Sequence, residues 1–184
     1  VELPEGSDQK LIGELQERGA TVELLSWTQL QDSWFDGQAE SKGNHLDLSA
    51  MAEPYRLEGA KTLGFELIYE LGRVPDAILI PTGAGIGLVA IAKAFEEMEA
   101  MSWIGSARPK LIAVQSAQFA PLVHAFRKHR DGIERWTRSS QTAAGELRCS
   151  SRAGGALALD ALRRSRGTAI AVEEKELRDG RSQM

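Results

Sequence analysis

The chain has 184 residues, of which 42% are hydrophobic and 26% are charged, and its net charge at pH 7 is −4. These values are ordinary for a globular protein, and a chain of this length buries about 70% of its unfolded surface. The acidic balance argues against nucleic acid as the main partner, because phosphate contacts require a basic surface. No apolar run approaches the ~20 residues of a membrane span, so we expect no membrane partner.

The cysteine and histidine content argues against a disulfide or a metal site. The single cysteine, Cys149, has no second cysteine to pair with, and no Cys/His cluster indicates zinc. His124 and His129 are spaced wrongly for two ligands on one helical face, so we expect no metal. A lone thiol fits a reducing compartment, which predicts a cytoplasmic protein. The chain starts at Val1, in what looks like the end of a strand, and we expect it to begin inside a longer protein.

Helical and strand patterns alternate along the chain. Helices are expected where apolar residues recur every three or four positions, and strands where short apolar runs end at glycine or proline. In the first half of the chain we expect a strand end at 1–4, a helix at 8–18, strands at 21–25 and 45–48, a helix around 63–71 and a strand at 77–80. In the second half we expect a helix from 87 to about 100, a strand at 110–114, helices at 119–129 and 154–165, a strand at 168–172 and a helix from 173. Residues 28–44 fit a weak helix or a loop, and residues 130–152 show no clear period.

This alternation predicts an α/β fold with three layers, a mostly parallel sheet with helices on both faces. We expect residues 1–48 to form the second half of a smaller α/β domain. Residues 49–184 are then most of a larger α/β domain, which is incomplete in this chain.

The stretch from residue 76 to residue 95 carries the clearest sign of a ligand site. A buried strand leads into three alternating glycines, Gly83, Gly85 and Gly87, and then into a helix. Glycine lets the backbone approach a ligand closely, and the first N–H groups of a helix are free to bind an anion. Two interpretations are open at this point: a phosphate-binding loop, or a tight strand-to-helix turn without a ligand.

Two common phosphate-binding motifs do not fit this loop. The spacing GxGxG is one residue shorter than the dinucleotide motif GxGxxG, and the next strand ends in Gln115 where an acidic residue is usual. No Lys-Ser/Thr pair follows the glycines, which excludes a nucleotide P-loop. What remains is a phosphate-binding loop of another kind.

The neighbouring blocks carry a family resemblance. They are EPYRLEGAKT at 53–62, PTGAGIGL at 81–88, KAFEEMEA at 93–100 followed by WIG and RPK, and VQS at 114–116 followed by APLV at 120–123. In this order and spacing, the chain resembles threonine synthase, in the fold type II (tryptophan synthase β-like) group of pyridoxal-phosphate enzymes. The resemblance is closest from residue 54 to residue 126 and looser over 1–27 and 154–172.

The resemblance implies a cofactor, a site and a reaction. The phosphate of pyridoxal phosphate would be bound by Thr82, Gly83, Ala84, Gly85, Ile86 and Gly87. The whole enzyme would be a lyase that converts O-phosphohomoserine to threonine and phosphate, with the cofactor as electron sink. A homodimer in the cytoplasm is also implied.

Two residues depart from the family pattern within the loop. Glycine is common at the position of Ala84, so we expect Ala84 to strain the backbone if a positive φ is needed there. A hydroxyl residue is common at the position of Ile86, so a donor to phosphate is lost.

The residues that the family uses for chemistry are not recognisable in this chain. The lysine that forms the Schiff base would lie before the first residue, and Ser41-Lys42-Gly43-Asn44 is in the wrong place to replace it. Lys61 and Lys93 are expected on helices, facing solvent or paired with carboxylates. We therefore predict no catalytic residue here. The alternative to an enzyme part is an inactive remnant that binds a phosphorylated ligand or only a protein partner.

Overall fold

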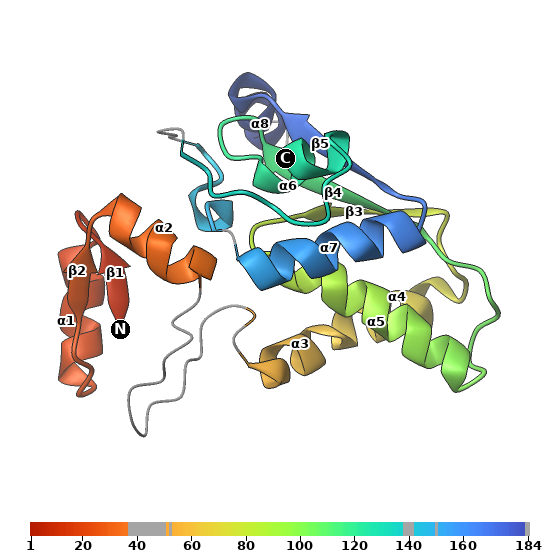
Figure 1. Cartoon of the computed structure of the whole chain (residues 1–184). Coiled ribbons are helices and arrows are strands. Elements are labelled where there is room, and N and C mark those ends of the chain that lie inside the picture. The colour runs from red at the N-terminus through yellow and green to blue at the C-terminus, as the bar shows by residue number, and fades with distance from the viewer. Residues whose placement is uncertain (37–50, 52, 138–141, 150, 183–184) are drawn as a thin grey trace.

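The computed structural model describes residues 1–36, 51, 53–137, 142–149 and 151–182. The elements run in the order β1 (Glu2–Pro4), α1 (Gln9–Glu17), β2 (Glu23–Leu25), α2 (Trp27–Asp36), α3 (Pro54–Ala60), α4 (Thr62–Leu71), β3 (Ala77–Pro81), α5 (Ile86–Ala100), β4 (Lys110–Ser116), α6 (Pro121–Arg127), the short 3-10 helix η1 (Gly145–Leu147), α7 (Arg152–Arg164), β5 (Thr168–Val172) and α8 (Glu174–Ser182) (Figure 1). None of the helices in these ranges is long and apolar enough to cross a membrane.

The strands form two parallel sheets. β1 pairs with β2, and β3, β4 and β5 form a second sheet in that order. The α/β fold with parallel strands is therefore confirmed. The two sheets lie on either side of the predicted domain boundary at 48/49, but the boundary itself and the predicted strand at 45–48 lie outside the described residues. The division into domains stays a prediction.

One helix was missed by the sequence analysis. Residues 54–60 form α3, and Glu53 caps it by accepting from the backbone N–H of Arg56 at 3.1 Å. Pro54 occupies the first turn, where its missing N–H costs nothing. The next helix, α4, ends at Leu71, as predicted, and Gly72 follows it in the left-handed conformation. A capping residue followed by proline was the signal that could have revealed α3.

Three helices cover one face of the β3–β4–β5 sheet. The strand order follows the chain order, so successive right-handed crossovers place their helices on the same face. The core on this face is built mainly from α5, α6, α7 and the strands, and its large buried side chains include Leu88, Phe95, Leu111, Val123 and Leu162. Figure 1 shows α5 and α7 side by side along the sheet.

The opposite face of this sheet is partly open. Leu79 on β3 is 63% exposed and Ile170 on β5 is 36% exposed, and Ile112 and Val114 between them are only half-buried. Parallel sheets are usually covered on both faces. The described residues thus bury one face fully and leave apolar side chains on the other.

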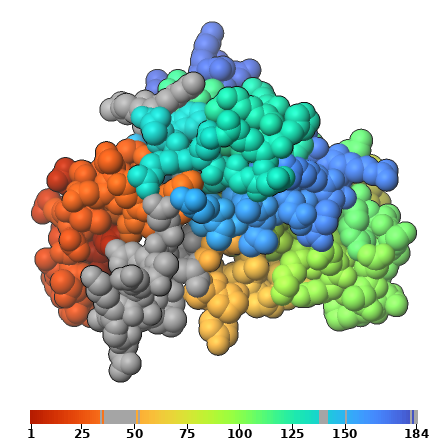
Figure 2. Space-filling model, viewed as in Figure 1, coloured from red at the N-terminus to blue at the C-terminus, as the bar shows by residue number. Residues whose placement is uncertain are grey.

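The N-terminal βαβα segment contacts the larger part through α2. Asp32 pairs with Arg135 at 2.8 Å, and the guanidinium of Arg148 lies 3.7 Å from the ring centre of Trp27. Phe35 is buried in the main core cluster. Figure 2 shows residues 1–36 against the surface formed by the segment around residues 142–149.

The two faces of β3 predict opposite costs of mutation. Ile80→Ala removes a 7%-exposed side chain from the core and should lower the free energy of unfolding by about 2–4 kcal/mol. Leu79→Ala, one residue earlier on the open face, should cost less than about 1 kcal/mol. Urea denaturation followed by circular dichroism measures both. Equal costs for the two variants would show that the open face is covered in solution.

Candidate functional site

All six sequence-predicted site residues line one cavity. The residues from Thr82 to Gly87 border a space of about 220 Å³ together with Pro81, Leu88, Leu147 and Cys149. The cavity lies where the carboxyl end of β3 meets the start of α5, which is the edge where open α/β sheets bind ligands.

The loop presents a helix N-terminus to this cavity. Gly85 is the N-cap of α5 and makes no side-chain cap. Val89 donates to the carbonyl of Gly85 at 3.0 Å, so the N–H groups of Ile86, Gly87 and Leu88 precede the first intrahelical bond. These groups lie at the positive end of the helix dipole. The arrangement suits an anion with several acceptor oxygens.

The expectation of backbone strain at Ala84 was wrong. The positive φ falls one residue later, at Gly85, where φ is 100°. Helix α7 also leaves little space for a side chain at Gly85, because an added Cβ would lie 3.0 Å from the carbonyl oxygen of Gly154 and 3.2 Å from Cβ of Ala158. Glycine is therefore needed at 85 for conformation and for space.

The side chain of Thr82 serves the loop itself. Its hydroxyl donates to the carbonyl of Ile80 at 2.7 Å, and the residue is 2% exposed. Its carbonyl accepts from the amide of Gln115 at 3.1 Å, and the same amide's oxygen accepts from the N–H groups of Leu122 and Val123. Gln115 thus joins the loop to α6. Its place at the end of β4 was the sequence signal for a residue near the site.

The segment after residue 142 closes over the loop. An added Cβ on Gly83 would lie 2.7 Å from the sulfur of Cys149 and 3.2 Å from the carbonyl oxygen of Leu147. This close approach, rather than a positive φ, requires glycine at 83. No sequence pattern predicts this contact, because residues 130–152 have no period and the contact joins positions more than sixty residues apart.

The thiol of Cys149 is set up for packing and not for nucleophilic attack. Burial raises its pKa, and the N–H of Ala84, which points to the sulfur, only partly offsets this. A protonated thiol is a poor nucleophile. Cys149 thus fills the space beside Gly83.

Lys61 and Lys93 form a network with two carboxylates. Nζ of Lys61 donates to both carboxylate oxygens of Glu97 at 2.7 Å and pairs with Glu58 at 2.5 Å. Lys93 contacts Glu58 and lies 3.2 Å from Glu97. The four charges join α3, the start of α4, and α5. Neither lysine lines the glycine-loop cavity. Of the two expected alternatives, facing solvent or pairing with carboxylates, the structure shows pairing for both lysines.

The network shifts the pKa values of its members in opposite directions. Hydrogen bonds from Lys61 and then Lys93 hold the pKa of Glu58 below its ordinary value, and Lys61 does the same for Glu97. Hydrogen bonds to Glu58 and Glu97 raise the pKa of Lys61. Carboxylates whose pKa falls on folding stabilise the protein above their unfolded pKa, and this stability is lost as the pH falls through the folded value.

Lys61→Met should therefore destabilise the protein at neutral pH and flatten its acid response. We expect the Tm at pH 7 to fall by about 2–4 °C, because two half-exposed carboxylates lose their main partner. Below pH 4.5, the ordinary pKa of the two glutamates, the wild type should lose stability more steeply than the variant. Denaturant unfolding over a pH series tests this. Lys10→Met, which removes only the exposed pair with Glu14, is the control, and equal acid slopes for Lys61→Met and the wild type would contradict the assignment.

The described residues hold no group of three or more His, Cys, Asp or Glu side chains that could bind a metal ion. Among the described residues, the backbone N–H groups of the loop are the main polar groups of its cavity. The fold and the loop together define an α/β protein in which a helix N-terminus opens into a cavity at the carboxyl end of a parallel strand.

Comparison with known proteins identifies the family to which this chain belongs. Residues 1–184 match the family model described as pyridoxal-phosphate dependent enzyme, and the chain belongs to that family. This confirms the resemblance found in the sequence and the expectation of pyridoxal phosphate as the cofactor.

Curated relatives are threonine synthases. The chain is 35% identical to that of Methanosarcina acetivorans over 125 residues, which are 67% of this chain and 30% of the relative. It is 36% identical to that of Methanocaldococcus jannaschii over 125 residues, with the same coverage. The chain thus matches about 30% of the length of these relatives.

Solved structures agree with the fold. Maize serine racemase superposes with a TM-score of 0.68 at 15% identity, covering 97% of this chain and 50% of the racemase. Threonine deaminase isoform 2 from Solanum lycopersicum gives a TM-score of 0.60 at 17% identity, covering 94% of this chain and 46% of the deaminase. At these identities the likeness concerns the fold alone.

Proposed function

We propose that this chain supplies the cofactor-phosphate site of a pyridoxal-phosphate lyase that acts like threonine synthase. The observation that carries the proposal is the cavity lined by Thr82 to Gly87 at the N-terminus of α5, in a chain of this family. The substrate would be O-phosphohomoserine, as the names of the curated relatives suggest a threonine-forming reaction. When bound, the cofactor withdraws electrons from the reacting carbon atoms of the substrate.

The residues of this chain would bind and orient the phosphate. The N–H groups of Ile86, Gly87 and Leu88 would donate to its oxygens, and the α5 dipole would favour its negative charge. Ile86 offers no hydroxyl, and the hydroxyl hydrogen of Thr82 is already donated to Ile80. Affinity for the phosphate would therefore rest on backbone groups. Gln115 would keep the loop in place through its bond to Thr82.

We further propose that the lysine that forms the Schiff base is not among the residues of this chain. No lysine belongs to the set that lines the cavity in the described part of the structure. Lys61 and Lys93 are held by Glu58 and Glu97. Lys42, which lies outside the described residues, is excluded only by its place in the sequence.

The absence of a lysine at the described cavity also favours a second candidate function. A chain that keeps the phosphate site without the lysine would bind a phosphorylated ligand without turning it over, or would only bind a protein partner.

The proposal of a lyase also includes the assignment of residues 1–48 to a smaller domain and of residues 49–184 to a larger one. It includes the expected homodimer in the cytoplasm as well.

Gly87→Asp tests the phosphate site without disturbing the fold. An added Cβ at Gly87 meets only Cγ2 of Ile80 at 3.8 Å, and aspartate is favourable in the first turn of a helix. The carboxylate would, however, repel a bound phosphate. We expect binding of pyridoxal phosphate and of inorganic phosphate, measured by calorimetry, to weaken by about tenfold or more, with the Tm unchanged or raised.

Gly87→Asn is the matched neutral control and should retain most of the affinity. If Gly87→Asp binds both ligands as tightly as Gly87→Asn, the phosphate does not bind at this helix N-terminus, and the proposed site is wrong.

Borohydride reduction tests the proposed absence of the reactive lysine. The chain is incubated with pyridoxal phosphate, reduced, digested and mapped by mass spectrometry. We expect scattered modification of exposed lysines at low yield, with no lysine modified in near-stoichiometric amount and protected by inorganic phosphate. Stoichiometric, phosphate-protected labelling of one lysine would show that the chain holds the catalytic residue, and would favour an enzyme over a binding remnant.

A further inference from the structure

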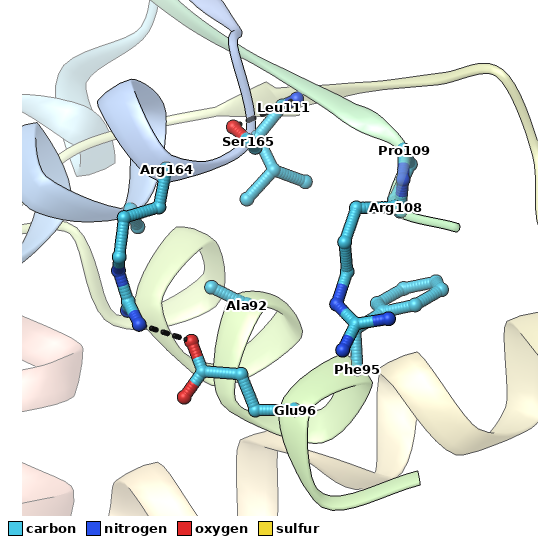
Figure 3. A pocket seen from close by; sticks show the side chains of 9 residues that line it. Ala92, Phe95, Glu96, Arg108, Pro109, Leu111, Arg164 and Ser165 are labelled. Atoms are coloured by element: carbon cyan, nitrogen blue, oxygen red, sulfur yellow. Dashed lines mark hydrogen bonds and ion pairs between the residues drawn. The ribbon is translucent and has the colours of Figure 1, made fainter. Parts of the chain in front are cut away.

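A second cavity lies at the other edge of the sheet from the glycine loop. It has a volume of about 200 Å³ and is enclosed by the later turns of α5, the last turns of α7 and the residues that lead into β4 (Figure 3). The glycine loop follows the carboxyl end of β3, whereas this cavity adjoins the amino end of the parallel strand β4. The two cavities share no lining residue.

The inner wall of this cavity, called here the α5–α7 pocket, is apolar. It is formed by Ala92, Phe95, Pro109, Leu111 and Ala161. The hydroxyl of Ser165 is turned to the carbonyl of Leu162 at 3.0 Å and so offers its hydrogen to the protein rather than to a ligand. The volume is below the roughly 300–1,000 Å³ of sites for drug-sized ligands. The space beside this wall therefore has room for one small apolar group.

The mouth of the pocket carries one charge of each sign side by side. Nη1 of Arg164 and Oε1 of Glu96 lie 2.6 Å apart, and Figure 3 shows the pair at the lower end of the pocket. Nε of Arg164 is held by Asp160 at 2.8 Å. The described residues form no ion pair with Oε2 of Glu96 or with Nη2 of Arg164. Each charge keeps one position for a ligand.

Arg108 forms the opposite side of the mouth of the pocket and has a structural role. It donates to the carbonyls of Gly105 at 3.2 Å and Ala107 at 3.0 Å, and it also contacts Glu99. These bonds fix the loop that precedes β4. Both terminal nitrogens of Arg108 are thus used within the protein, whereas Nη2 of Arg164 and Oε2 of Glu96 point to recognition by these two groups.

We infer that the α5–α7 pocket binds a free α-amino acid with an apolar side chain. The ammonium group would bind Glu96, the carboxylate would bind Arg164, and the side chain would fill the space against Phe95 and Leu111. A ligand with only one charge would meet one partner of like sign at the mouth, whereas a zwitterion satisfies both. This inference goes beyond the proposed phosphate site and does not depend on it.

Calorimetry with L-leucine, L-isoleucine and L-phenylalanine tests the site in the chain as it stands. At least one of them should bind saturably. 4-Methylpentanoate lacks the ammonium group of leucine, isopentylamine lacks the carboxylate, and L-serine lacks the apolar side chain. Each should bind about tenfold more weakly or worse, because each leaves a charged group or the apolar wall without its partner.

Two variants locate the binding. Ala92→Leu extends a half-buried side chain of α5 into the pocket and should abolish amino-acid binding while phosphate binding stays unchanged. Arg164→Gln should weaken it about tenfold or more. Arg163→Gln is the matched control, since the neighbouring Arg163 pairs with Asp131 at 2.9 Å and does not line the pocket. Circular dichroism and the Tm confirm that each variant is folded.

The outcomes separate this inference from the proposed function. Gly87→Asp should leave amino-acid binding intact. Saturable binding that is lost in Ala92→Leu and kept in Gly87→Asp supports the pocket. No binding of any of the three amino acids, equal binding of 4-methylpentanoate and leucine, or wild-type affinity in Ala92→Leu would overturn it.

Discussion

Helix α7 approaches the glycine loop so closely that only glycine fits at the contact. A Cβ on Gly154 would lie 2.2 Å from the carbonyl oxygen of Ala84, and one on Gly85 would lie 3.2 Å from Cβ of Ala158. Contacts this short leave no room for a side chain between loop and helix. The start of α5 is thereby fixed against α7, and the core between these helices and the sheet follows from that placement. The geometry of the phosphate site thus depends on glycines from two distant segments.

Helices α5 and α7 run from the glycine loop to the second cavity, although only α5 lines the cavity of the glycine loop. Their first turns meet at the glycine loop, and their later turns enclose the α5–α7 pocket. A rigid helix pair connects the cavities across the sheet, although nothing in the packing requires that one ligand alter the other site. Coupling between the two sites would require that these connecting helices adopt two arrangements that the ligands bind differently.

Local sequence patterns predicted the fold and the loop, but not the contacts that shape the loop. The strand at Ala77–Pro81, the helix after the glycines and the end of α4 at Leu71 all depend on residues close in sequence, and each was predicted. The contacts of Gly83 with Cys149 and of Ala84 with Gly154 join segments far apart, and no periodic pattern encodes them. The α5–α7 pocket was also invisible, because its walls come from three separate segments.

The polar groups that face the glycine-loop cavity are mostly backbone groups. Gly83, Gly85 and Gly87 have no side chain, Ala84 and Ile86 have apolar ones, and the hydroxyl of Thr82 serves Ile80. Such a site recognises an anion by the direction of its N–H groups and by the helix dipole, so it is insensitive to pH over the range in which phosphate keeps its charge. It also adds little chemistry of its own. Under the proposed function, this loop would hold the phosphate of the cofactor, and the reacting groups would come from residues that face the other end of that cofactor.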